Sequence, residues 1–162
     1  GDPRPMRPRP APSGFTLVEL LIVIVILGVL AAIVIPTTKN VSKEAEQSRF
    51  ASNLHSFVGQ AELYRAKTGE HVEDGSSGLV PAGFEPYVRA EDWEAGTPVG
   101  GVWDTETSSF GITSALGVHF QSNAKPDEYM TEIDVLLGDD GDLQTGLFRK
   151  IASGRFYFIL MP

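Results

Sequence analysis

The hydrophobic and polar positions divide the chain into three stretches with different patterns. In the first, residues 15–35, Thr16 and Glu19 are the only polar side chains, and none occurs from Leu20 to Ile35. At about 1.5 Å per residue, a helix of this length spans about 30 Å, the thickness of the hydrocarbon core of a bilayer. A helix that is apolar on every side needs lipid or a large protein around it. We therefore predict a transmembrane helix over residues 15–36.

Two other interpretations of this apolar segment remain open. It could be a helix buried in the core of a soluble protein, or the apolar part of a cleavable secretory signal. A secretory signal would share the basic residues in front of it but should end in a small-residue cleavage site. Here the run ends instead in Pro36-Thr37-Thr38 and passes into a helical pattern. The sequence therefore favours the membrane helix over both alternatives.

The second stretch, residues 37–69, has the pattern of an amphipathic helix. Its apolar residues recur at spacings of three and four, which is typical of one buried helix face. Gly69 follows Lys67-Thr68 at a position that favours left-handed backbone geometry and ends helices. The pattern predicts one helix from about Phe15 to about Lys67, with a membrane half and a half that packs on a domain. The residues of the apolar face are Phe50, Leu54, Phe57, Val58, Ala61 and Tyr64.

The third stretch, residues 70–162, predicts a small α+β body. Residues 70–111 are rich in Gly, Pro and acidic residues, which is typical of a long ordered loop. Strands are expected where β-branched and aromatic residues cluster. These clusters are Val102-Trp103, Val118-His119-Phe120 and the run from Phe156 to Leu160.

A short helix is expected in the body from Asp127 to Leu137. Asp127 is a candidate for its cap, and Ile133, Leu136 and Leu137 are expected to face inward. The predicted fold class is therefore α+β, in which a long N-terminal helix packs its second half on a small antiparallel sheet. The predicted divisions are 1–14, 15–36, 37–69 and 70–162.

The charges are distributed unevenly along the chain. The net charge is −8, and residues 1–14 carry +2, so the chain from Phe15 onward carries −10. Phosphate binding needs a basic surface, so we expect no nucleic-acid partner. The chain has no cysteine, which excludes disulfides and thiolate metal sites.

Residues 1–14 read as a leader and not as part of a fold. Their sequence, GDPRPMRPRPAPSG, contains too much proline for a helix or a strand to propagate. Met6 is a candidate start, which would leave a short basic leader from Met6 to Gly14. A start at Gly1 is the alternative.

The junction between this leader and the apolar run resembles a known processing motif. Gly14-Phe15-Thr16-Leu17-Val18-Glu19 is similar to the prepilin motif of type IV pilin-like proteins. The resemblance implies that a prepilin peptidase cuts between Gly14 and Phe15 and methylates the new amine of Phe15. It also places the family's glutamate at Glu19, fifth in the mature chain, and the proline that ends the apolar stretch at Pro36.

A carboxylate within an apolar segment needs a physical reason. At membrane depth it costs about 2.5–3.5 kcal/mol or more. One interpretation is that Glu19 snorkels to the headgroups. The other is that it pairs in the assembled filament with the Phe15 amine of a neighbouring copy, because that amine is mostly charged at neutral pH. An unpaired Glu19 in the filament core would be heavily penalised, so the pair would also set the register of neighbouring helices.

The body carries a weaker resemblance to the major pseudopilins of type II secretion systems. It lies in ELYRAKTGEHVEDGSSG, which starts at Glu62, and in the segment from Thr97 to Trp103. Adhesive type IV pilins commonly close a C-terminal loop with a disulfide, which this chain cannot form. The resemblance therefore implies a structural subunit of a periplasmic pseudopilus that drives protein export. The alternatives are the pilin of a surface fibre for adhesion, motility or DNA uptake, and a membrane-anchored binding domain.

This resemblance also implies partners and a location. The expected partners are identical or related pilin-like subunits, the prepilin peptidase, an inner-membrane assembly platform and, before assembly, the lipid bilayer. The chain would cross the inner membrane once, with its C-terminal domain in the periplasm, and then join the filament.

One acidic run is a candidate metal site. Asp139-Asp140-Gly141-Asp142 places three carboxylates in four residues, and calcium binds several such oxygens at once. In major pseudopilins a calcium site in the C-terminal loop region replaces the disulfide, so the resemblance implies structural calcium here. The alternative is a solvated turn, and we expect no cofactor to be required.

The sequence does not predict an enzyme. His55, His71 and His119 are scattered, and no Glu-flanked histidine pair indicates zinc. Ser, His and Asp occur, but not in a nucleophile string such as G-x-S-x-G.

Overall fold

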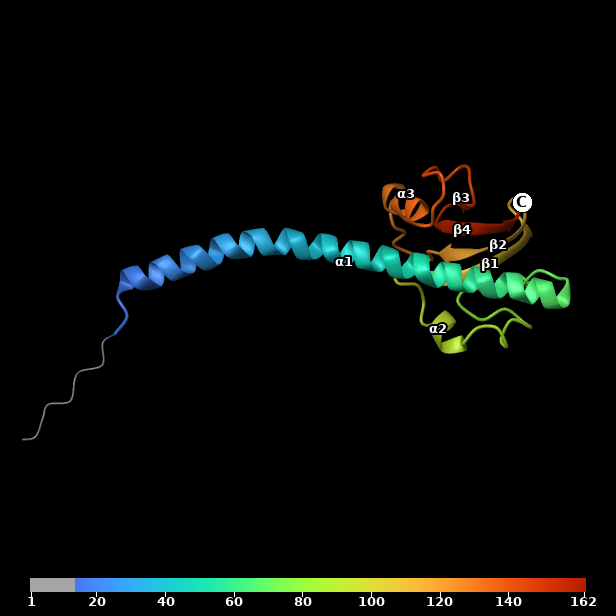
Figure 1. Ribbon diagram of the computed structural model, residues 1–162, viewed down its shortest axis with the longest axis horizontal. Helices are drawn as coiled ribbons and strands as arrows, with labels where there is room; N and C mark the ends of the chain where they lie inside the picture. Colours follow the sequence, from blue (N-terminus) through green and yellow to red (C-terminus); the bar gives the residue numbers. More distant parts are fainter. Residues whose placement is uncertain (1–13) are drawn as a thin grey trace, which may run out of the picture. The chain divides into compact units, whose positions relative to one another are not determined.

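The structure is a computed structural model that describes residues 14–162, without the side chains of residues 33–41. Within that range the chain forms three helices and four strands (Figure 1). It divides into two compact units, Gly1–Val41 and Ser42–Pro162. Of the predicted leader, only Gly14 belongs to the described residues. The elements are α1 (Leu17–Thr68), α2 (Ala90–Glu94), β1 (Val102–Ser109), β2 (Ile112–His119), α3 (Asp127–Leu136), β3 (Phe148–Ala152) and β4 (Arg155–Met161).

The long helix predicted from the sequence is confirmed as α1, which contains 52 residues. It ends where the sequence predicts, because Gly69 has a left-handed φ of 80° and its N–H donates to the carbonyl of Arg65 at 2.8 Å. Arg65 and Lys67 lie in the last turn, where positive charge is favourable beside the exposed carbonyls.

The four strands form one antiparallel sheet in the order β1-β2-β4-β3. Trp103 pairs with Val118, Leu116 with Phe158, and Phe148 with Phe158. With α1 packed on this sheet, the predicted α+β class is confirmed. Strands occur at all three predicted places, whereas β3 was not predicted because its sequence, FRKIA, is short and contains two basic residues.

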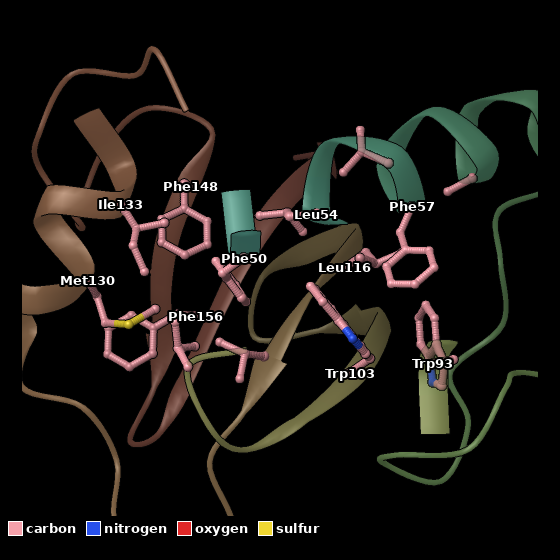
Figure 2. Close-up of a cluster of buried hydrophobic side chains, with 14 of the residues drawn as sticks. Phe50, Leu54, Phe57, Trp93, Trp103, Leu116, Met130, Ile133, Phe148 and Phe156 are labelled. Atoms are coloured by element: carbon pink, nitrogen blue, oxygen red, sulfur yellow. The ribbon is translucent and has the colours of Figure 1, made fainter. Parts of the chain in front are cut away.

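The body half of α1 packs on the sheet through aromatic side chains, as Figure 2 shows. Phe50 stacks on Trp103 with ring centroids 5.3 Å apart and planes inclined by 4°. Phe57 meets the Trp103 ring edge-on at 4.9 Å and the Trp93 ring at 5.1 Å. Such pairs add about 0.5–1.5 kcal/mol each beyond the burial of their area. The largest fully buried side chains of this core are Trp93, Trp103, Phe50, Phe84, Phe148 and Phe156.

Both tryptophans of the chain lie fully inside this core. Their indole N–H groups are buried and find no acceptor among the described residues. An unpaired buried donor carries a desolvation cost, so the two rings are held by packing and not by a polar anchor.

The loop expected over residues 70–111 contains two regular elements. Its middle holds the short helix α2, which places Trp93 in the core, and its last part is β1. The loop prediction was wrong for α2 and for the part of β1 beyond the predicted strand Val102-Trp103, because acidic residues occupy both elements. Helix α2 reads AEDWE, and β1 reads VWDTETSS.

The predicted short helix is confirmed as α3, with two corrections. Its N-cap is Pro126, not Asp127, and no side chain caps it. Leu136 is also not inward, since 51% of it is exposed. The buried face of α3 is centred on Met130, Ile133 and Asp134, and a residue two positions after Asp134 points to the opposite side of a helix.

Candidate functional site

The residues of the processing motif stand at the start of α1. Thr16 and Glu19 form a reciprocal cap: the Thr16 N–H donates to Glu19 Oε2 at 2.7 Å, and the Glu19 N–H donates to Thr16 Oγ1 at 3.2 Å. The Thr16 hydroxyl also donates to Oε2 at 3.0 Å. This is a capping box, which satisfies backbone donors at the first turn. Within the described part of the chain, Oε1 of Glu19 has no hydrogen-bond partner.

The apolar side chains that follow are not covered by the chain itself. The large apolar residues from Leu17 to Leu30 are each half exposed or more, on every side of the helix. Over the described residues, none of the helices combines the length and the apolarity that a membrane crossing requires. The predicted span, residues 15–36, ends among residues whose side chains are not described, so the role of Pro36 lies outside the described residues.

A second group of chemical interest lies at the end of α3. Asp134, Asp139 and Asp140 each offer a carboxylate oxygen, and these three oxygens lie within 4.8 Å of one another. Asp134 is fully buried. Its Oδ2 accepts the Gly141 N–H at 2.7 Å, whereas its Oδ1 is buried without a partner among the described residues.

The turn after α3 is organised by its other carboxylates. Asp139 Oδ2 accepts the N–H groups of Leu147 and Phe148, at 2.7 Å for Phe148, and so fixes the start of β3. Asp140 accepts the Thr145 hydroxyl at 2.7 Å and the Asp142 N–H at 2.9 Å.

The pKa values of the two neighbouring carboxyls shift in opposite directions, although burial acts to raise both. Burial raises the pKa of Asp134 to about 6, and the nearby charge of Asp139 adds to this effect. Burial also opposes ionisation of Asp139, but the N–H donors of Phe148 and Leu147 outweigh it and hold the pKa of Asp139 below its ordinary value. The cluster therefore brings carboxyl groups of like charge close together, an arrangement that costs energy.

A third polar group is buried on the face of the sheet that points away from α1. Asp104 accepts the Tyr157 hydroxyl at 2.6 Å and an Arg155 N–H at 3.2 Å, and Arg155 also contacts Glu106. Burial raises the pKa of Tyr157 and of Glu106, although Arg155 counteracts the change for Glu106. Successive strand residues point to opposite faces, so Asp104 and Glu106 lie opposite the core side of Trp103.

Ser77 and His119 lie beside Asp104, but these three residues do not form a catalytic triad. Ser77 Oγ lies 3.0 Å from Nδ1 of His119, and Asp104 Oδ2 lies 3.7 Å from the same nitrogen. A triad needs the nucleophile and the carboxylate on different ring nitrogens. The arrangement therefore fits a structural network.

The structure places the predicted metal residues in two groups. Asp139 and Asp140 lie together, while Asp142 is not in that cluster and instead accepts the Gln144 N–H at 2.9 Å. Sequence reasoning missed Asp134. Its signal was a carboxylate beside Ile133 on the inward face of the predicted helix, where an acid needs a partner.

Comparison with known proteins agrees with the N-terminal motif. Residues 9–35 match the family described as "Prokaryotic N-terminal methylation motif". The chain is 37% identical over 79 residues to type II secretion system core protein G of Klebsiella pneumoniae, covering 47% of this chain and 56% of that protein. It is 35% identical over 69 residues to core protein G of Dickeya chrysanthemi, with coverages of 41% and 45%.

A further relative is named for a pilus. The chain is 28% identical over 117 residues to the type IV wide pilus major component PilA4 of Thermus thermophilus, which covers 59% of this chain and 89% of that protein. The chain spans about half the length of the core protein G relatives it matches. No solved structure matches.

A methylation motif at the head of an apolar helix, with a helix packed on an antiparallel sheet, makes this chain similar to proteins of the type IV pilin-like class. Within that class the chain is similar to type II secretion system core protein G, the relation expected from its sequence.

Proposed function

We propose that this chain is a structural subunit of the periplasmic pseudopilus of a type II secretion-like system, where it assembles through the apolar half of α1 to drive protein export. The observation that carries the proposal is the methylation motif at the head of a helix half whose apolar side chains are exposed all round. Such a surface needs lipid before assembly and other copies after it.

Processing is the first step of this proposal. A prepilin peptidase cuts after Gly14 and methylates the amine of Phe15. Both residues are accessible, because Gly14 is exposed and lies before the first helical residue, Leu17. A helix would have to unwind to enter a protease, whereas this junction is already outside α1.

Glu19 acts in the second step. Its Oε2 caps the helix while Oε1 has no partner in the described residues, so we assign to Oε1 the Phe15 amine of a neighbouring copy. The pair would compensate a charge that is costly in an apolar filament core.

The location follows from the same proposal. The chain crosses the inner membrane once through residues 15–36, with Pro36 at the end of the crossing and the body in the periplasm. An inner-membrane assembly platform then transfers it to the filament. The similarity to relatives named type II secretion system core protein G supports a place in a secretion system.

We also propose calcium as a structural ion at Asp134, Asp139 and Asp140. Three clustered carboxylates with one buried, unpaired oxygen match the preference of calcium for several oxygen ligands. The ion would neutralise their repulsion and fix the turn before β3. Asp142, the further ligand predicted from the sequence, would need to rotate away from Gln144 to join them.

A type IV pilus pilin is the second candidate, favoured by the similarity that covers 89% of the wide pilus component. Electron microscopy separates the two, since a pilin forms long surface fibres and a pseudopilin forms filaments within the periplasm. A membrane-anchored binding domain would form neither.

The mass of the mature N-terminus tests the proposal as a whole. Loss of the leader through Gly14 together with one added methyl group is expected. The variant Gly14→Val should retain the leader and stay unmethylated, because its side chain blocks close approach of the backbone to the protease. A wild-type chain that keeps its leader would refute assembly through this motif and indicate a simple anchor.

A further inference from the structure

The loop that follows α1 and the end of β4 bring a histidine and a methionine together. Nε2 of His71 lies 3.2 Å from the sulfur of Met161, although the two residues are 90 positions apart in the sequence. Figure 1 shows the end of α1 and the C-terminus at the same end of the body. The pair is separate from the processing motif, the acidic cluster and the network around Asp104.

Hydrogen bonds fix the backbone beside both side chains. After the histidine, the carbonyl of the buried Val72 accepts the Thr107 hydroxyl at 3.0 Å. After the methionine, the Pro162 carbonyl accepts the Thr113 hydroxyl at 2.9 Å. The methionine itself pairs with Ser114 in the sheet. The nitrogen and the sulfur are therefore presented from two anchored segments, which lowers the cost of bringing them to one ligand.

The two side chains are also accessible to an ion. Met161 is 38% exposed, and His71 is half-buried. The other methionine within residues 14–162, Met130, is fully buried in the core. The contact thus offers a thioether sulfur and an imidazole nitrogen to solvent at one place.

A thioether and an imidazole are ligands that monovalent copper prefers. Soft sulfur ligands select Cu(I), and imidazole also binds copper, whereas calcium and magnesium take oxygen ligands. With bonds of about 2.0 Å to nitrogen and about 2.3 Å to sulfur, donors about 3.5 Å apart subtend a tetrahedral angle at a metal ion. The observed separation of 3.2 Å is close to this value, and an exposed methionine reaches it by a small side-chain rotation.

We propose that Nε2 of His71 and Sδ of Met161 bind Cu(I) at the surface of the body. The ion takes the place of the hydrogen between the nitrogen and the sulfur, and the imidazole then carries its proton on Nδ1. The copper binds as Cu(I) and stays Cu(I), so no electron is transferred. Solvent occupies the open coordination positions. The site lies within the body and does not require a filament, so this inference goes beyond the proposed function.

Silver binding to the full-length chain in detergent tests the site. Ag⁺ is the first probe, because it shares the charge and softness of Cu(I) and does not change oxidation state. Cu(I), kept reduced by ascorbate and in competition with a chromogenic chelator, is the second. Calcium is present in excess to occupy the carboxylates. We expect one tightly bound Ag⁺ per chain, and equimolar zinc should not displace it, since a thioether is too soft a ligand for zinc to compete.

Variants of the two ligands assign the site. His71→Ala and Met161→Leu should each weaken Ag⁺ binding about tenfold or more, because even a partner that only orients a ligand contributes about 10–100-fold. Met161→Leu conserves volume and apolarity, so its melting temperature should equal that of the wild type. His55→Ala is the matched control, since it removes an exposed histidine whose ring meets Phe158. Met6→Leu, outside the described residues, is the control for the methionine, and both controls should bind Ag⁺ as the wild type does.

The methyl carbon resonance of Met161 tests whether both ligands hold the same ion. One equivalent of Ag⁺ should shift this resonance in the wild type, and the shift should be lost in His71→Ala. A shift that persists unchanged in that variant would overturn joint binding.

The remaining outcomes separate the site from the proposed function. Ag⁺ binding that is absent from the wild type, or that is unchanged in both ligand variants, would overturn the site and leave the contact as a hydrogen bond. Displacement of Ag⁺ by equimolar zinc would overturn the assignment to a soft metal. These measurements use the unassembled chain, so their failure would leave the proposed pseudopilus untouched.

Discussion

The two halves of α1 are both rich in apolar side chains, but only one of them is covered by the rest of the chain. In the body half, Phe50 and Leu54 are fully buried against the sheet, whereas the residues from Leu17 to Leu30 remain exposed. The body half has an apolar face and a polar face, and the N-terminal half is apolar all round. The comparison shows that one helix can suit two environments. The body half packs on the sheet of its own chain, whereas the apolar half needs lipid or other copies around it.

The largest effect is expected from removing the one charge of the apolar half. Glu19→Ala should abolish filament assembly, while insertion and cleavage after Gly14 stay intact, because insertion depends on the apolar run. Filament yield and N-terminal mass are the measurements. The loss of the cap alone costs only about 0.5–2 kcal/mol, which is small for a helix of 52 residues.

Glu19→Gln separates the cap from the charge. Glutamine can replace glutamate in a capping box but cannot neutralise an amine. It should therefore fail to assemble as Glu19→Ala does. Normal filaments from Glu19→Gln would show that the cap, not the charge pair, is the role of this residue.

In the body half, truncation of one core side chain should destabilise the fold strongly. Phe50→Ala removes the ring that stacks on Trp103 and should lower the free energy of unfolding of the body by about 3–5 kcal/mol. Urea unfolding measures this. Ile22→Ala, in the apolar half, should leave the stability of the body unchanged, and an equal loss from both would contradict the distinction between the halves.

Calcium should stabilise the body and leave the apolar half unaffected. At a hundredfold excess over Kd, binding to the folded state alone adds about 2.7 kcal/mol, which raises the melting temperature by several degrees. Magnesium should do less, since it demands tighter octahedral geometry. Thermal melts in calcium, magnesium and chelator provide the measurement.

Three variants assign the ligands. Asp134→Asn and Asp140→Ala should remove most of the calcium shift, since both oxygens belong to the cluster. Asp142→Ala should keep most of it if that residue remains bonded to Gln144. Equal melting temperatures of the wild type in calcium and in chelator would make the turn a solvated one.

The smallest expected effect is the pH dependence of stability that His119 causes on the face of the sheet that points away from α1. Burial, and then the charge of Arg155, lower the pKa of His119, while Asp104 opposes them. The folded state therefore binds fewer protons than the unfolded state, and its stability decreases as the pH falls below about 6.5. His119→Gln should lose less stability between pH 7 and pH 5 than the wild type. A larger loss in the variant would contradict this direction.

The sequence was sufficient to predict elements that have a long periodic pattern or end at a residue typical of a helix terminus. The spacing of Phe50, Leu54 and Phe57 predicts the buried face of α1, and Gly69 predicts its end. The processing motif could be identified because its residues are contiguous. The Thr16-x-x-Glu19 cap was equally visible but was overlooked, since Glu19 was interpreted through its charge alone.

Other features depend on tertiary contacts that a local pattern does not contain. Helix α2 has five residues and a single buried one, Trp93, so it has no periodicity to detect. The acidic cluster joins Asp134 to Asp139 across the end of a helix, and the length of α3 decides which carboxylates meet. Leu136 was placed inside because it is apolar, although the helical period directs it outward.

The two buried tryptophans provide an intrinsic fluorescence signal for the folding of the body. No other indoles exist in the chain, and neither ring has an acceptor for its N–H among the described residues. Their emission should therefore lie at short wavelength in the folded body and move to longer wavelength when water reaches them. Because Phe57 of α1 touches both rings, this signal reports whether the body half of the helix is seated on the sheet, within intact filaments as well as in the isolated body.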